Sequence, residues 1–249
     1  MEKRLYITSI FFSLCIFLTG CLNNEGESSQ SFVGEPLVVL STEGAPVLKS
    51  KMGDVLFQAP MLAGKVEKGD CLLADFTIKF EKQTSPYTIS ELRNDEPVPQ
   101  IGATPTEDLK AATEEAFPDT ILGVSFPTNG RSQPILIENK LFFMFQQKRG
   151  QGDAFAYKMT YALPVGETPS LYVSAMGNGK ENPGEERDVY THYAFDMTEF
   201  IKAARKNNST TISFALRYRA TLEAEENETI FENYSTNNLQ IEIDTTKIK

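Results

Sequence analysis

Apolar and polar residues alternate in short runs over most of the chain after Pro36, and turn residues separate the runs. The clearest run lies in 71–80, where every second residue is apolar: Leu72, Ala74, Phe76, Ile78 and Phe80. A period of two predicts a strand with one buried face. Further apolar runs lie at 37–40, 55–57 and 87–92. We therefore expect a small barrel or a twisted sheet over residues 35–93.

A proline-rich segment follows at 94–106, with Pro97, Pro99 and Pro105. Proline cannot donate a hydrogen bond to a strand ladder, so we interpret this segment as a connection and as the boundary between two domains. The residues after Thr106 share one apolar helical face up to Pro118, which predicts a short helix. The expected linker, including this helix, covers residues 94–118.

Strand patterns return from residue 119 onward. The apolar runs lie at 121–126, 135–137, 141–145, 155–163, 171–175, 189–195, 212–218 and 239–243. About eight short strands with turns between them are typical of two packed antiparallel sheets, so we expect a β-sandwich over residues 119–249. The run Leu141–Phe145 is apolar on both faces, which predicts a central strand.

One segment of this second domain departs from the strand pattern. Residues 195–204 start as a strand and continue with helical spacing, and Asp196 or Thr198 is suited to cap the helix. Phe200, Ile201 and Ala204 are then expected to pack onto the sandwich. The pattern predicts a short helical crossover between two strands.

The N-terminus has the features of an export signal. Charged residues at 2–4 precede about 14 mostly apolar residues, Leu5–Leu18, a stretch too short to span a membrane as a helix. The sequence Leu18-Thr19-Gly20-Cys21 resembles the lipobox of bacterial lipoproteins. This resemblance implies cleavage before Cys21 and attachment of lipid to its sulfur. An ordinary cleavage site and an uncleaved anchor are the alternatives.

These features predict the location of the protein. We expect a signal peptide over residues 1–20 and a flexible polar tether over residues 21–34. The protein would then be lipid-anchored at the outer membrane, either periplasmic or surface-exposed. No later apolar segment is long enough to span a membrane, so none is expected in the mature chain.

Cys71 is the one cysteine that remains after Cys15 leaves with the signal peptide and Cys21 is acylated. No internal disulfide is therefore expected, although the compartment is oxidising. We expect a structural role for Cys71 at the start of a strand. The alternative is a nucleophile, and the neighbouring Asp70 and Asp75 have the wrong charge to stabilise a thiolate.

Charge and histidine content restrict the chemistry further. The 24 basic and 34 acidic residues give a formal net charge of −10, which argues against a nucleic-acid partner. His192 is the only histidine, so zinc sites that need two histidines are excluded. We expect a structural or surface role for His192, and no catalytic residue, cofactor or metal site. The acidic charge also predicts that the domain stands off anionic headgroups beyond its tether.

Several polar features have both a structural and a functional interpretation. The segment 177–186, which begins Gly177-Asn178-Gly179-Lys180, is either a connecting loop or a ligand contact. Two acidic groups are either solvated loops or calcium ligands: Glu185, Glu186 and Asp188, and Glu223, Glu225, Glu226 and Glu228. Six tyrosines are either core residues or a sugar-binding face: Tyr157, Tyr161, Tyr172, Tyr190, Tyr193 and Tyr218. Asp119-Thr120-Ile121 and Asp244-Thr245-Thr246 match a short O-glycosylation motif of Bacteroidota.

Together with the lipobox, three segments resemble the NigD-like lipoproteins of Bacteroidota. They are 65–76 (KVEKGDCLLADF), 171–175 (LYVSA) and 193–200 (YAFDMTEF). The resemblance implies an OB-like N-terminal domain followed by a C-terminal β-sandwich. It implies no established activity, and it carries no site residue over to this chain.

We therefore expect a non-enzymatic envelope lipoprotein with a binding or accessory role toward a protein or glycan partner. A carbohydrate-binding accessory lipoprotein is one alternative, and a concave face with exposed tyrosines would favour it. A glycan hydrolase that uses two of Glu185, Asp188 and Glu223 is another, and facing carboxylates would favour it. An open sheet edge would favour a protein partner.

Overall fold

The computed structural model describes residues 28–51, 55–80, 83–107, 121–126, 134–149, 155–165, 167–177, 187–205, 209–223 and 229–243. Within these ranges, only the backbone is described at 148–149, 219–223 and 229–238. The predicted signal peptide, Cys21, nearly all of the predicted 106–118 helix and both O-glycosylation motifs except Ile121 lie outside the described residues. In the part of the chain that is described, no helix is long and apolar enough to cross a membrane.

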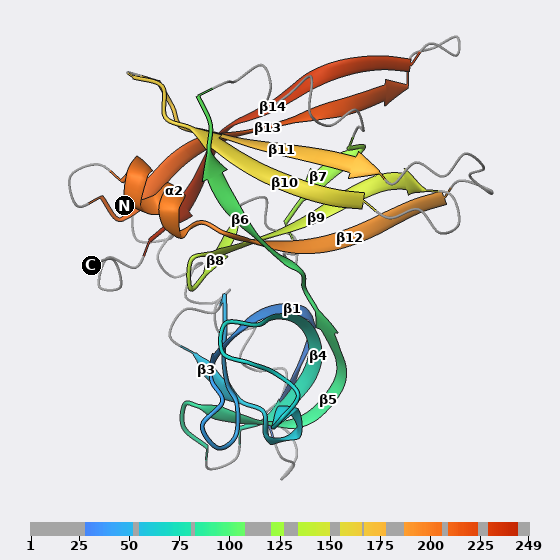
Figure 1. Ribbon diagram of the computed structural model, residues 1–249. Helices are drawn as coiled ribbons and strands as arrows, with labels where there is room; N and C mark the ends of the chain where they lie inside the picture. The colour runs from blue at the N-terminus through green and yellow to red at the C-terminus, as the bar shows by residue number, and fades with distance from the viewer. Residues whose placement is uncertain are drawn as a thin grey trace, which may run out of the picture.

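The first unit is a closed five-stranded barrel with the strand order β1-β2-β3-β5-β4, which confirms the predicted small barrel (Figure 1). Its strands are β1 (Ser29–Ser41), β2 (Val47–Ser50), β3 (Leu56–Gln58), β4 (Cys71–Lys79) and β5 (Tyr87–Pro97), with a short 3₁₀ helix η1 at Pro60–Leu62. The alternating apolar residues point inward, and Phe32, Phe57 and Phe76 have ring centroids 4.7–5.7 Å apart in the core. Contacts of this kind add to the stability gained from burial.

The barrel includes residues that the sequence assigned to the tether. Residues 29–34 belong to β1, where Ser29 lies opposite Lys79 and Phe32 lies opposite Phe76. Burial of Phe32 favours this strand over a flexible tether. Gly34 has a φ of +58°, a conformation that glycine adopts at little cost, and it lies in the irregularity between Phe32 and Glu35.

The second unit is a curled nine-stranded sheet with the order β14-β13-β11-β10-β6-β12-β9-β7, and β8 pairs with β9. Its elements are β6 (Gln100–Pro105), β7 (Gly123–Ser125), β8 (Ile135–Ile137), β9 (Lys140–Arg149), β10 (Phe155–Ala162), β11 (Ser170–Gly177), β12 (Arg187–Asp196), α2 (Thr198–Ala204), β13 (Thr211–Glu223) and β14 (Thr229–Glu242). The two halves of the sheet fold over a common core as a sandwich, in line with the predicted fold class (Figure 1). The sheet is mixed rather than antiparallel, because β6 runs parallel to β10 and β12, and β11 runs parallel to β13.

The prediction of a connection at 94–106 is wrong, because most of this segment is strand. Residues 94–97 pair with β4 as the end of β5, and β6 then lies between the two halves of the sheet. β6 pairs with β12 through 100–102 and with β10 through 103–105. Pro97 and Pro105 close their strands and Pro99 lies between β5 and β6, so the prolines sit where strands end.

Helix α2 confirms the predicted crossover between β12 and β13. Phe200, Ile201 and Ala204 are buried in the sandwich core. The N-cap residue is Met197, which makes no side-chain cap, so the prediction that Asp196 or Thr198 caps the helix is wrong. The carboxylate of Asp196 still accepts the backbone N–H of Thr198 at Oδ1, at 2.9 Å, and satisfies one donor of the first turn.

A separate apolar cluster joins the barrel to the sheet; we call it the junction cluster. Its members are Val38, Cys71, Leu73, Val98, Ile135, Ile137, Phe142 and Ala194. It explains why Leu141–Phe145 is apolar on both faces: Leu141 and Phe143 face the sandwich core, whereas Phe142 faces the barrel. The prediction of a central strand is wrong in position, since β9 is next to the edge strand β7. The cluster ties both units together, and an ion pair of 2.9 Å between Lys49 and Glu138 spans the same gap.

Candidate functional site

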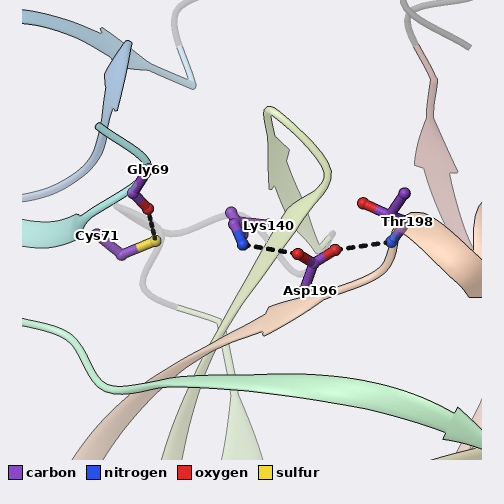
Figure 2. A network of polar contacts seen from close by, with 5 residues as sticks. All are labelled: Gly69, Cys71, Lys140, Asp196 and Thr198. Carbon is purple, nitrogen blue, oxygen red and sulfur yellow. Dashed lines mark hydrogen bonds and ion pairs between the residues drawn. The ribbon is translucent and has the colours of Figure 1, made fainter. Parts of the chain in front are cut away.

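A small polar network borders the junction cluster on the sheet side (Figure 2). Nζ of Lys140, the first residue of β9, donates to Oδ2 of Asp196, the last residue of β12, at 2.8 Å. These residues meet because β9 and β12 are antiparallel neighbours in which Lys140 lies opposite Asp196. Burial raises the pKa of Asp196, but hydrogen bonds from Lys140 and Thr198 outweigh it, so the pKa lies below its ordinary value.

Cys71 lies on the barrel side of this network, and its thiol is not poised for chemistry. Burial raises the pKa of Cys71 to about 12, only partly opposed by the charge of Lys140. Its Sγ contacts the carbonyl oxygen of Gly69 at 3.8 Å (Figure 2). Asp70 raises the pKa of Cys71, as expected, and the second acid that raises it is Asp196 rather than Asp75. The Asp75 carboxylate instead accepts the N–H of Gly34 at 2.7 Å. A thiolate is therefore negligible at neutral pH.

Two hollows lie beside the junction cluster. One, of about 480 Å³, is lined by Gln100, Ile101, Gly102, Ala103, Lys140, Asp196, Thr198 and Glu199. The other, of about 380 Å³, is lined by Lys51, Pro134, Ile135, Leu136, Thr211, Gln240 and Glu242. Both present positive and negative side chains, and among their described lining residues neither combines a nucleophile with a base in the arrangement that covalent catalysis uses.

Glu35 is a buried acid in the barrel and is only 2% exposed. Its Oε2 lies 3.6 Å from Nζ of Lys51, and its Oε1 has no hydrogen-bond partner among the residues that the structure describes. Burial raises the pKa of Glu35, and Lys51 and Ser50 offset part of that rise. Glu35 does not stand out in the sequence because it follows Gly34 at the irregular part of β1, outside any regular alternation.

His192 is half-buried on β12. It is two residues before Ala194, so it lies on the same face of the sheet, which is the face toward the barrel. Burial lowers the pKa of His192, and the nearby Glu96 carboxylate offsets part of this decrease. Over the described residues, no group of histidine, cysteine and acidic side chains is arranged to hold a metal ion.

Most of the candidate tyrosines belong to the core. Tyr157, Tyr161, Tyr172 and Tyr218 are buried and Tyr193 is half-buried, whereas Tyr190 is 54% exposed. The Tyr157 hydroxyl donates to the buried Oε1 of Gln147, and Tyr157 stacks on Phe145 at 4.4 Å between centroids. The core interpretation of these rings is therefore confirmed for all but Tyr190.

The acidic candidates are only partly placed. Asp188 is exposed on β12 and accepts a hydrogen bond of 3.3 Å from Gln146. Glu223 ends β13, where only the backbone is described, and Glu185, Glu186, Glu225, Glu226 and Glu228 lie outside the described residues. The loop residues 178–186 lie outside them as well, and Gly177 is the last residue of β11.

The sheet also has a projecting part that the sequence did not indicate. β11 pairs with β13 only at residues 215–218 of β13. Beyond that point β13 and β14 still pair with each other, from Arg219 opposite Asn233 to Glu223 opposite Thr229. We call residues 219–223 and 229–233 the ribbon. β14 ends the order of strands, so within the described chain its outer edge has no strand partner (Figure 1). The base of the same strands, at Thr211 and Glu242, lies by Lys51 of the barrel, so the ribbon points away from the junction.

Comparisons with known proteins place this fold among proteins of Bacteroidota. No protein-family model and no curated protein matches the chain. The structure is similar to an uncharacterized protein of Parabacteroides merdae (TM-score 0.58, 15% identity, 86% of this chain and 99% of that chain). It is also similar to a candidate lipoprotein of Bacteroides fragilis (0.59, 10%, 84% and 98%) and to a NigD-like immunity protein of Bacteroides caccae (0.50, 12%, 86% and 99%).

These likenesses cover nearly the whole of each solved structure. At such identities they establish a shared fold, which agrees with the barrel and sandwich that the NigD-like resemblance implies. None of the three proteins is described as an enzyme.

Proposed function

We propose that this chain is a lipid-anchored envelope protein of the NigD-like type that binds a partner protein through its ribbon. The observation that carries the proposal is the outer edge of β14, which pairs with no other described strand where it projects with β13 beyond the sheet. An edge strand offers a row of backbone donors and acceptors that an extended segment of another protein can pair with.

The amino-acid sequence from Arg219 to Asn233 indicates what kind of segment fits. Residues 219–233 contain five glutamates and one arginine. The edge lacks the lysine or proline with which many proteins block strand pairing. Complementary charge steers association and suppresses wrong partners. The occupant is therefore an extended segment rich in lysine or arginine.

The base of β13 supports this role. A ribbon binds with less loss of freedom when its support is rigid, and Ile212, Phe214 and Leu216 anchor β13 in the sandwich core. The burial of four of the six candidate tyrosines favours a protein partner over a sugar.

Photo-crosslinking in the native host tests the proposal. A photoreactive amino acid at Phe231 on the ribbon should give one discrete adduct with a polypeptide, and the same amino acid at Lys158 on β10 should not. Changing Glu225, Glu226 and Glu228 to Gln should reduce the adduct several-fold. Neutralising Glu43, Glu91 and Glu167, which are exposed elsewhere, is the matched control and should leave it unchanged.

The outcomes separate the alternatives. Equal adducts at both positions would contradict a binding site on the ribbon. So would an adduct whose yield is unchanged when Glu225, Glu226 and Glu228 are replaced by Gln. An adduct whose added mass is removed by glycosidases would favour the carbohydrate-binding alternative. Intact mass of the protein from its host tests the anchor separately, since lipid on Cys21 adds the mass of its acyl chains.

A further inference from the structure

The attachment point of the tether lies at the end of the barrel farthest from the sheet. β4 starts in the junction cluster with Cys71 and Leu73 and ends at Lys79. Eight residue steps at about 3.3 Å each place Lys79 up to about 26 Å from Cys71 along the strand. β1 runs antiparallel to β4, with Val38 opposite Cys71 and Ser29 opposite Lys79. The first described residues therefore lie at this far end.

The chain between the predicted lipid and the barrel is short. Seven peptide steps separate Cys21 from Ser28, whose carbonyl already accepts the N–H of Phe80 at 2.8 Å. Seven steps span at most about 25 Å when fully extended. If lipid is attached at Cys21, Ser28 cannot lie farther than this from the membrane surface.

The far end of the barrel is also the part that suits a lipid surface. The residues described there, 28–31, 77–80 and 83–88, include one lysine, Lys79, and no acidic residue, in a chain with a net charge of −10. The described residues of this end contact one another: Gln83 donates to the carbonyl of Lys79 at 2.5 Å and accepts the N–H of Thr88 at 2.7 Å, and Phe80 packs on Tyr87. An acidic protein approaches anionic headgroups most readily through such a locally basic end.

We propose that the far end of the barrel, around Ser29, Lys79 and Thr84, faces the bilayer and that the barrel holds the sheet and its ribbon away from it. This orientation rests on the proposed anchor at Cys21. The partner of the barrel end is a phospholipid headgroup surface. The bilayer and the ribbon's protein partner then occupy separate parts of the molecule.

Energy transfer on vesicles tests the orientation. Because Cys71 is buried with a pKa raised to about 12, and Cys21 carries lipid, one added surface cysteine can be labelled selectively. Thr84→Cys marks the barrel end, and Met176→Cys marks the exposed end of β11 in the half of the sheet that contains β13 and β14. The lipidated full-length chain is reconstituted into vesicles of phosphatidylethanolamine and phosphatidylglycerol that contain an acceptor lipid.

We expect transfer from position 84 to exceed transfer from position 176 several-fold. Equal transfer from both positions, or stronger transfer from 176, would overturn the orientation. A 20-residue Gly-Ser insertion after Cys21 should reduce transfer from position 84, and an unchanged value would show that the short tether does not set the orientation.

The anchor is scored independently. Flotation of the wild-type chain with vesicles, and its loss in Cys21→Ser, measures the anchor and not the orientation. A chain that floats but gives the wrong transfer ratio overturns only this inference. A chain that carries no lipid overturns the proposed function as well.

Discussion

The Lys140 ammonium lies 2.8 Å from Oδ2 of Asp196, a residue 56 positions away in the sequence, and the pair borders the junction between barrel and sheet. A pair of partly buried groups contributes modestly to stability because water still screens it. The pair mainly fixes the position of Asp196, which also accepts the N–H of Thr198 in the first turn of α2.

Replacing Lys140 by Met removes the partner of Asp196. We expect a loss of about 1 kcal/mol in the free energy of unfolding at pH 7, measured by urea denaturation. The pKa of Asp196 is lowered in the folded state, so its contribution is present above the ordinary value of 3.8 and is lost as the pH falls through the folded value. The difference between wild type and Lys140→Met should therefore shrink at acid pH. A difference that stays constant down to pH 2 would contradict this assignment.

The contribution of Glu35 to stability should depend on pH in the opposite way to that of Asp196. Its pKa is raised in the folded chain, so its charge costs stability at pH values above the folded pKa, and the cost vanishes below the ordinary value of 4.5. Glu35→Gln keeps the shape and removes the charge, so we expect a stability gain of up to about 1 kcal/mol at pH 7. Thermal unfolding at pH 7 and at pH 4 measures both values. A loss at pH 7 would mean that the pairing of Glu35 with Lys51 outweighs the cost of burial.

Cys71 should be inert while the protein is folded. With a pKa of about 12 and a buried sulfur, it should react with a thiol reagent at pH 8 only in denaturant. Cys71→Ser should destabilise the fold by about 1–3 kcal/mol, because it buries a hydroxyl at an apolar position. Rapid labelling of the native chain would contradict the buried placement.

Phe142 and Phe143 are adjacent on β9 and face different cores, which makes them a matched pair. Each change to Ala should cost about 3–5 kcal/mol. Only Phe142→Ala should loosen the barrel from the sheet, so limited proteolysis should then cut near Val98–Pro99 and release both units. If Phe143→Ala gives the same cut at the same rate, the junction cluster is not what joins them.

Features that depend on residues close together in the sequence could be predicted, and features that depend on contacts between distant segments could not. The strand at 71–80 and helix α2 follow from local periodicity, and both are present. Strand β6 was not predicted, because the prolines around it are typical of a connection between domains, whereas in the structure they lie at strand ends. The double-sided β9 is recognised, but its position is not, since only the barrel explains why Phe142 is apolar.

The candidate site was less predictable for the same reason. Lys140 and Asp196 belong to different strands, and nothing local to either residue marks them as partners. The ribbon depends on the lengths of β13 and β14 relative to β11, and periodicity locates strands better than it locates their ends.

Shortening the ribbon is the most direct test of whether the ribbon binds the partner protein. Arg219 and Asn233 lie opposite each other, so residues 220–232 can be replaced by a two-residue Asn-Gly turn that closes β13 onto β14 without touching the rest of the sheet. We expect the shortened chain to fold with a similar melting temperature and to reach the membrane. We also expect that it no longer co-purifies with the polypeptide crosslinked at Phe231. Undiminished co-purification would show that the partner binds elsewhere on the molecule.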